Sequence, residues 1–149
     1  MSNNAIANER VIVFGASGFL GSHVADALSS AGYQVRLFDR SASPHLNLDQ
    51  VIEAARDCSV VYNFAAIADI DEAHNKPIPT ATINVLGNMH VLEAARIAGA
   101  RRFVFASSVY VYSESGSFYR ASKQAAERFT ETYHERYGLD YNILRYGSL

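Results

Sequence analysis

The stretch VIVFGASGFLG, residues 11–21, decides the fold of this chain. Its four leading apolar residues predict a short buried strand, and Gly15, Gly18 and Gly21 predict a tight turn behind it. From His23 to Ala31, apolar residues recur at helical spacing, and Gly32 stands where a helix end commonly takes a positive φ. A strand, a glycine turn and a helix together form a cradle for a phosphate group, because backbone amides can approach the ligand and the helix N-terminus offers unpaired N–H donors.

Length and composition predict a single domain. The chain has 149 residues, of which 49% are hydrophobic, which is enough for one globular core. Residues 1–9 are mostly polar and show no periodicity, so we expect a flexible N-terminal tail and a domain over residues 10–149. Five histidines stand at least 16 residues apart, a spacing that predicts no metal site.

Charge and cysteine usage narrow the class of protein. The net charge is −2, and the one adjacent basic pair, Arg101-Arg102, is expected in a solvated loop, so we predict no nucleic-acid surface. No apolar run approaches the roughly 20 residues that span a bilayer, and the N-terminus does not look like a signal peptide. The single cysteine, Cys58, fits a reducing compartment and is expected to be a buried filler. These features predict a cytoplasmic protein with no membrane partner.

The remaining chain alternates between strand and helix patterns. Continuously apolar runs such as Val60 to Ala66 predict strands that are covered on both faces, and the long connections between them predict parallel βαβ units. The fold class is therefore an α/β doubly wound parallel sheet of the Rossmann type, with helices on both faces. The further strands are expected at 34–39, 102–108 and 141–146, with a very short candidate at 45–48. The further helices are expected at 49–55, capped by Asp49, and at 77–98 and 119–137.

Asp39 ends the second predicted strand, 18 residues after Gly21. A dinucleotide-binding unit places a carboxylate at about this offset, where it accepts hydrogen bonds from ribose hydroxyls. The alternative is an ordinary loop carboxylate. The glycine turn upstream favours the first interpretation.

The candidate chemistry follows the strand at 102–108. Tyr119 and Lys123 are four residues apart on a predicted helix, so both side chains leave the same face. Ser107 and Ser108 end the preceding strand, and the carboxyl ends of parallel strands meet at one crevice. An ammonium near a tyrosine favours the phenolate, so we expect Lys123 to lower the pKa of Tyr119. The alternative is that Tyr119 and Lys123 are two solvent-exposed side chains on a helix with no chemical role.

Several motifs together resemble the extended branch of the short-chain dehydrogenase/reductase superfamily, which includes nucleotide-sugar epimerases and dehydratases. The resemblance covers residues 10–149 and rests on GASGFLG, Asp39, NFAA (63–66), NVLG (84–87), ASSVYVY (106–112), YRASK (119–123) and LRYGS (144–148). It implies an NAD cofactor, a nucleotide-sugar substrate and catalysis by Ser108, Tyr119 and Lys123, with Ser107 as the poorer serine. It implies the cofactor-binding residues Gly15, Ser17, Gly18, Phe19, Leu20, Gly21, Asp39, Arg40, Ala65, Ala66, Tyr119 and Lys123.

The resemblance also implies a reaction. Tyr119 removes a proton from a sugar hydroxyl while Ser108 holds that oxygen, and a hydride passes from the sugar carbon to the nicotinamide. In epimerases the hydride returns to the other face of the sugar. The family's dehydratases carry an Asp-Glu pair just after the catalytic hydroxyl, where this chain has Val109-Tyr110, so dehydration fits less well.

The sequence departs from the family pattern in three places. Family members are about twice as long, and their C-terminal half supplies most of the sugar-nucleotide pocket, so we expect this chain to lack that subdomain. The interval from Ser108 to Tyr119 is only 11 residues, and Arg120 replaces the usual glycine. The alternative function is therefore a non-catalytic NAD(P)-binding module, a sensor or a fragment.

Two further expectations concern the cofactor type and the assembly. Asp39 would bind both ribose hydroxyls and repel a 2′-phosphate, which favours NAD over NADP, although Arg40 beside it is able to pair with that phosphate. The resemblance implies a homodimer through the helices at 77–98 and 119–137. Both patterns carry apolar residues on more than one face. The alternative is burial of those faces within the same chain.

Overall fold

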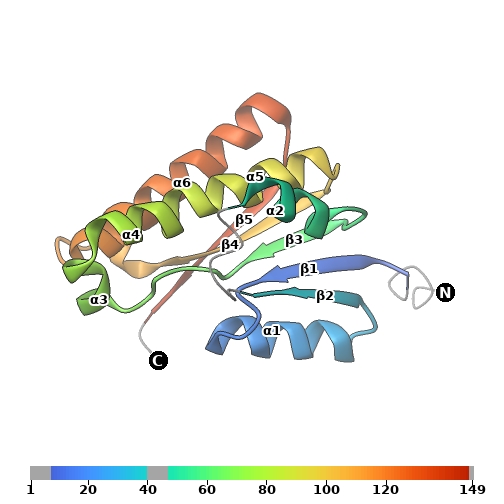
Figure 1. Cartoon of the computed structure of the whole chain (residues 1–149), viewed down its shortest axis with the longest axis horizontal. Helices are drawn as coiled ribbons and strands as arrows, with labels where there is room; N and C mark the ends of the chain where they lie inside the picture. Colours follow the sequence, from blue (N-terminus) through green and yellow to red (C-terminus); the bar gives the residue numbers. More distant parts are fainter. Residues whose placement is uncertain (1–7, 40–46, 148–149) are drawn as a thin grey trace.

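The computed structural model describes residues 8–39 and 47–147, which form one sheet surrounded by helices (Figure 1). Within these residues the sheet has five parallel strands in the order β2-β1-β3-β4-β5. The strands are β1 (Arg10–Phe14), β2 (Gln34–Phe38), β3 (Val60–Asn63), β4 (Arg102–Ser108) and β5 (Tyr141–Tyr146). The parallel doubly wound sheet predicted from the sequence is therefore confirmed.

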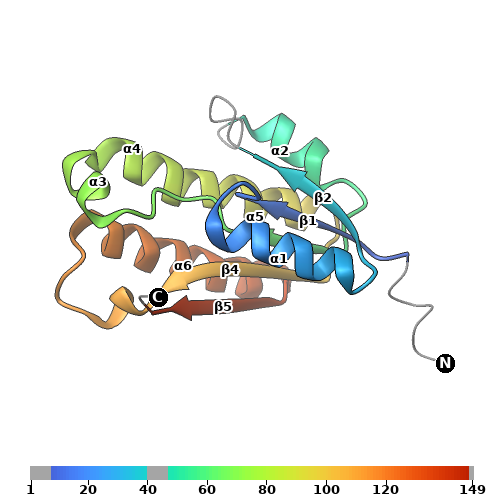
Figure 2. The same cartoon turned by 90° about the horizontal axis from the view of Figure 1, so that it is seen from below.

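Helices cover both faces of this sheet. Figures 1 and 2 show α1 on one face and α2, α5 and α6 on the other. The helices are α1 (Phe19–Ser30), α2 (Leu48–Ala55), α3 (Ile70–Asn75), α4 (Pro77–Ala81) and α5 (Gly87–Ile97). A π-helical segment η2 (Thr82–Leu86), a 3-10 turn η3 (Val109–Tyr112) and the long α6 (Ser117–Tyr137) complete the set.

The core lies on both faces of the central strands. Alternate residues of β1 point to opposite sides: Ile12 and Phe14 pack with α2 and α5, and Val13 packs against α1. All three of these side chains are fully buried. Cys58 belongs to the first of these clusters, as predicted for a small buried filler. Because β1 packs against apolar residues on both faces, its sequence is a continuous hydrophobic run.

Several element boundaries differ from those expected. β3 ends at Asn63 rather than Ala66, because the Asn63 side chain accepts a hydrogen bond from the Ala65 N–H at 3.1 Å and turns the chain out of the sheet. The cap of α2 is Asn47, which accepts from the Gln50 N–H at 3.1 Å, and Asp49 lies in the first turn instead. The short strand expected at 45–48 is not formed at Leu48, which begins α2, and residues 45–46 lie outside the described residues.

The helix expected at 77–98 is interrupted by the π-helical turn of η2. There Asn84 is buried, and its side chain accepts from the Ile67 N–H at 2.7 Å and donates to the Ile67 carbonyl at 3.0 Å. It also donates to the Ser122 hydroxyl at 3.0 Å. One amide thereby joins the segment after β3 to α6, which carries the candidate catalytic residues.

The N-terminal end of the described chain is held by an ion pair. Glu9, which we assigned to the predicted tail, accepts hydrogen bonds from Ser59 Oγ at 2.7 Å and from Arg101 Nε at 2.8 Å. Arg102 is the first residue of β4. The basic pair at 101–102 is therefore part of an ion pair and a strand rather than a solvated loop.

Candidate functional site

The glycine turn after β1 leaves no room for side chains. Gly15 has a φ of +78°, and a Cβ there would lie 2.6 Å from the Ala65 nitrogen. A Cβ on Gly21 would lie 2.0 Å from the Gly15 carbonyl oxygen. Gly18 is the N-cap of α1 and offers no side-chain bond to the first helical amides. The turn is thus a backbone cradle at a helix N-terminus, which is the arrangement that binds phosphate.

Asp39 lies beside this cradle. Its Oδ1 accepts hydrogen bonds from the Ser17 N–H at 2.9 Å and from Ser17 Oγ at 2.8 Å. The structure therefore brings the predicted acid and the glycine turn together across 22 residues of sequence. The carboxylate fits the role of a ribose acceptor. Arg40 lies outside the described residues.

A cavity of about 590 Å³ opens at the carboxyl ends of the strands. It brings together Leu20 of the cradle, Ala66 of the segment after β3, and the three candidate catalytic residues. Phe19 is 69% exposed, and its ring lies tilted against that of His23, with ring centroids 4.7 Å apart. The Ala65 amide already donates to Asn63. The complete lining is Leu20, Phe64, Ala66, Ala68, Asp69, Ile70, Asp71, Ala106, Ser107, Ser108, Tyr110, Tyr119, Lys123, Tyr146 and Gly147.

Lys123 is a buried lysine. Its Nζ donates to the Ala106 carbonyl at 2.8 Å and lies 4.9 Å from the centre of the Phe105 ring and 5.7 Å from that of Tyr119. Burial lowers the pKa of Lys123 from its usual 10.5 to about 8, and the negative charge of Glu127 opposes this shift. The ammonium therefore loses its proton at a lower pH than that of an exposed lysine.

Tyr119 is also buried, and its pKa is raised. Burial is the main cause, the neighbouring Tyr110 adds to it, and a side-chain hydrogen bond with Ser108 opposes it. This direction is opposite to the lowering that we expected from Lys123. Burial of the phenol decides the direction, and the Lys123 ammonium is bonded to a backbone carbonyl and lies over the Tyr119 ring.

The structure distinguishes the two serines at the end of β4. Ser107 Oγ donates to Glu127 Oε1 at 2.6 Å in a buried contact. Ser108 Oγ instead accepts from the Tyr110 N–H at 3.2 Å, and its interaction with Tyr119 lowers the pKa of that phenol. Ser108 is therefore the serine that is oriented toward the tyrosine.

The short interval between Ser108 and Tyr119 is closed by η3 and a turn at Gly116. Gly116 has a φ of +101°, and a Cβ there would lie 3.0 Å from the Tyr110 ring. Arg120 spans the turn, because its Nη1 donates to the Ser113 carbonyl at 2.8 Å. Arg120, which stands where the resembled family has a glycine, thus bonds across the shortened loop and does not line the cavity.

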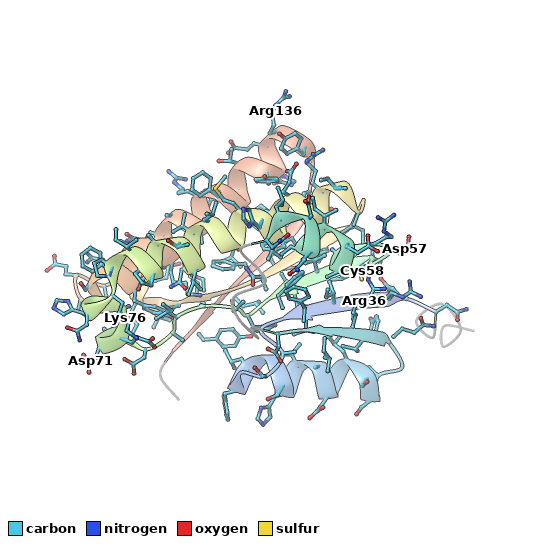
Figure 3. The ribbon with its side chains drawn as sticks, viewed as in Figure 1. Arg36, Asp57, Cys58, Asp71, Lys76 and Arg136 are labelled. Carbon is cyan, nitrogen blue, oxygen red and sulfur yellow. The ribbon has the colours of Figure 1, made fainter. Side chains whose placement is uncertain are left out.

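Sequence reasoning missed several residues of the site. Asp69 and Asp71, at the start of α3, line the cavity, as do Tyr110 and Tyr146. Glu127 lies behind it, one helical turn after Lys123, and this spacing is the signal that was available in the sequence. Figure 3 shows Asp71 and Lys76 at the α3 end of the molecule, far from Asp57 and Cys58. Cys58 therefore takes no part in the site.

The described residues offer neither a metal site nor a membrane-spanning helix. No group of three or more His, Cys, Asp or Glu side chains in residues 8–39 and 47–147 is arranged to hold a metal ion. None of the helices in the same ranges is both long enough and apolar enough to cross a membrane.

The cradle, the acid at the end of β2 and the cavity at the carboxyl ends of the strands define a dinucleotide-binding α/β domain. The chain belongs to the NAD-dependent epimerase/dehydratase family, whose model matches residues 11–149. It is 30% identical to a putative UDP-glucose 4-epimerase of Methanocaldococcus jannaschii over 93% of this chain and 55% of that protein.

Solved structures agree with this assignment. The UDP-glucose 4-epimerase of Brucella ovis in complex with NAD matches with a TM-score of 0.87 and 27% identity, over 94% of this chain and 52% of that one. The Thermus thermophilus UDP-glucose 4-epimerase in complex with NAD matches with a TM-score of 0.83 and 30% identity, over 92% of this chain and 54% of that one. The chain therefore spans about half the length of these relatives.

The lowered pKa of Lys123 predicts a pH-dependent stability. Between its folded pKa of about 8 and its usual 10.5, the unfolded chain binds more protons at this lysine than the folded one. The contribution of Lys123 to the free energy of unfolding therefore rises with pH across this window and is lost as pH falls through 8. Relative to Lys123→Met, we expect wild type to gain as much as about 3 kcal/mol, measured by urea unfolding at a series of pH values.

The exposed lysine, Lys76, provides the control for this measurement. Its side chain is 57% exposed and pairs with Glu72, so Lys76→Met should track wild type across the same pH range. Parallel stability curves for wild type and Lys123→Met would contradict the buried, destabilised ammonium.

Proposed function

We propose that this chain binds NAD and takes part in the epimerisation of a nucleotide sugar. The observation that carries the proposal is the shared cavity, which places Ser108, Tyr119 and Lys123 beside Leu20 of the phosphate cradle. The family is NAD-dependent, and the relatives named above are UDP-glucose 4-epimerases. A UDP-hexose is therefore the first substrate to test.

The residues present fit NAD. The turn at 15–21 would hold the diphosphate, Asp39 the ribose hydroxyls of the adenosine half, and the backbone at Ala65 and Ala66 the cofactor's central part. This interpretation is supported by the close packing of backbone on backbone at Gly15 and Gly21, which fixes the turn at the N-terminus of α1. When bound, the nicotinamide ring supplies a reversible hydride acceptor.

Proton transfer is assigned to the side chains of the cavity. Tyr119 would take the proton of a sugar hydroxyl, and Ser108, which lines the same cavity, would hold the same oxygen. Because burial raises the pKa of Tyr119, the phenolate needs a nearby positive charge. The Lys123 ammonium, which lines the same cavity, is the group that would supply it.

The alternative function is an NAD(P)-binding module without turnover. The observation that favours it is that the phosphate cradle and Asp39, which such a module needs, are joined by the Ser17 contacts. The mass of the natural gene product separates the two: a protein near twice this size supports the enzyme, and one of this size supports the module.

For both functions we propose a cytoplasmic location. The buried, unpaired thiol of Cys58 is in keeping with a reducing compartment.

Asp39 should decide the cofactor type. Its carboxylate would accept hydrogen bonds from the ribose hydroxyls and repel a 2′-phosphate, so we expect tighter binding of NAD than of NADP. Asp39→Ala should weaken NAD roughly tenfold, about 1.4 kcal/mol, and reduce the preference over NADP. Calorimetric titration measures both constants. Asp26→Ala, an exposed acid on α1, is the matched control, and wild type binding NADP more tightly would overturn the assignment.

The 149-residue chain alone should bind NAD and show little or no epimerisation of UDP-glucose. Orienting a sugar against a cofactor contributes on the order of 7 kcal/mol or more to barrier lowering, and this chain spans about half the length of its relatives. A coupled assay for UDP-galactose measures the turnover. Full NAD-dependent turnover that disappears in Tyr119→Phe would show that this chain supplies the sugar pocket by itself.

We also propose a homodimer through the helices at 77–98 and 119–137. Ile78 of α4 is 75% exposed and Phe118 of α6 is 45% exposed. A shallow apolar groove between these helices is lined by Pro77, Ala81, Val85, Phe118, Ala121 and Ser122. Burial of such a surface would favour association.

Sedimentation velocity tests the homodimer at tens of micromolar protein. We expect a dimer, and we expect Phe118→Asp to shift it toward monomer because a carboxylate would be desolvated in the interface. Leu37→Asp, at an exposed position on the distant β2, is the control. A wild-type monomer would contradict the proposal.

A further inference from the structure

Glu127 is a buried acid that the mechanism above does not use. It is 7% exposed, and both of its oxygens are hydrogen-bonded. Oε1 accepts from Ser107 Oγ at 2.6 Å and from Arg145 Nε at 2.9 Å, and Oε2 accepts from Arg145 Nη2 at 2.9 Å. Burial raises the pKa of this carboxyl, but the bonds from Arg145 and Ser107 outweigh it and hold the pKa below its usual value. Glu127 is therefore a buried anion.

The partners of Glu127 come from the strands that border the cavity. Ser107, on β4, directly precedes Ser108. Arg145, on β5, directly precedes Tyr146, which lines the cavity. The Arg145 guanidinium also lies over the Tyr112 ring, 5.0 Å from its centre, and donates to its hydroxyl. One carboxylate thus ties α6 to β4 and β5 directly, and to η3 through Arg145.

Glu127 also lies one helical turn after the buried lysine. It follows Lys123 by four residues on α6, so the two side chains leave the same face of the helix. The hydrogen-bond partner of Lys123 Nζ is a neutral backbone carbonyl, that of Ala106. The other titratable groups that line the same cavity are Asp69, Asp71, Tyr110, Tyr119 and Tyr146. Among all of these, the negative charge of Glu127 is the one that raises the pKa of Lys123.

We propose that Glu127 is a positioning residue of this site: its carboxylate locks the ends of β4 and β5 onto α6 and is the counter-charge that keeps Lys123 protonated. The proposal rests on the proposed function in that it assigns Lys123 to the site. Glu127 is not among the residues that line the cavity, so it acts through Lys123 and Ser107, which are.

Because of Arg145, the proposal predicts pKa shifts of opposite direction for two variants. Its bidentate pair with Glu127 neutralises part of the negative charge that Lys123 experiences. Removing the carboxylate should therefore lower the pKa of Lys123, whereas removing the guanidinium should raise it. A purely structural role for the pair would not produce opposite shifts, because both variants break the same contact.

The chain offers a direct measurement, because it contains only two lysines, Lys76 and Lys123. In protein labelled with carbon-13 at the lysine ε-carbons, two signals report their titration by NMR, and Lys76→Arg assigns them. We expect Glu127→Gln to lower the pKa of Lys123 from about 8 by roughly one unit and Arg145→Met to raise it. Lys76 should not move in either variant.

Glu131→Gln is the matched control. Glu131 lies one turn further along α6 and pairs with the exposed Arg128, so this variant makes the same change of charge on the same helix. It should leave the pKa of Lys123 unchanged. An equal shift in Glu131→Gln would assign the effect to the general charge of the helix and overturn the proposal.

Two other outcomes would also overturn it. One is a folded Glu127→Gln variant in which the pKa of Lys123 is unchanged, and the other is a shift in the same direction in both variants. Should Glu127→Gln not fold, Arg145→Met decides alone, because Arg145 is partly exposed and its loss leaves the carboxylate in place. A raised pKa there supports the proposal, and an unchanged or lowered one overturns it.

The lysine titration needs neither cofactor nor substrate. If the chain fails to bind NAD, the proposed function fails, but the titration still decides the role of Glu127. If NAD binds, the affinity provides a second readout. As the pH is raised, the affinity for NAD should then begin to fall at a lower pH in Glu127→Gln than in Glu131→Gln.

Discussion

The close approach of backbone to backbone at the glycine turn is the constraint on which the rest of the structure depends. Gly21 lies against the Gly15 carbonyl, and Gly15 lies against the chain that leaves β3. A single Cβ at either position would separate α1 from the sheet or push away the segment at 64–69. α1 and this segment form one side of the cavity. The cradle and the cavity therefore both depend on glycine at positions 15 and 21.

Buried polar groups hold the opposite side of the cavity. Asn84 bonds the segment after β3 to α6, and Glu127 bonds α6 to β4 and β5. Each group is fully hydrogen-bonded, so the cost of removing it from water is offset by specific partners. Lys123 differs from Glu127, because the charged group of Lys123 is hydrogen-bonded to a neutral carbonyl. Its pKa is lowered by burial. The site therefore keeps an ammonium that is easily perturbed by the charges around it.

Much of the fold was predictable from local pattern. The strands at 102–108 and 141–146 and the end of α6 at Tyr137 match the expected boundaries, because apolar runs and terminal glycines are properties of neighbouring residues. α3 and the π-helical turn of η2 were not predicted. Both are short, and their residues serve contacts with α6 and with the segment after β3 rather than an amphipathic repeat.

Amino-acid order alone was enough to determine the layered sheet, the phosphate cradle and the candidate set of Ser108, Tyr119 and Lys123, since each depends on residue types at short spacing. The folded chain was needed to show that Ser107 is bonded to Glu127, to bring Asp39 onto Ser17, and to reverse the expected shift in the pKa of Tyr119. These outcomes depend on burial and on partners 11 to 22 residues away in sequence. Desolvation and charge act through space, so only the packed structure decides them.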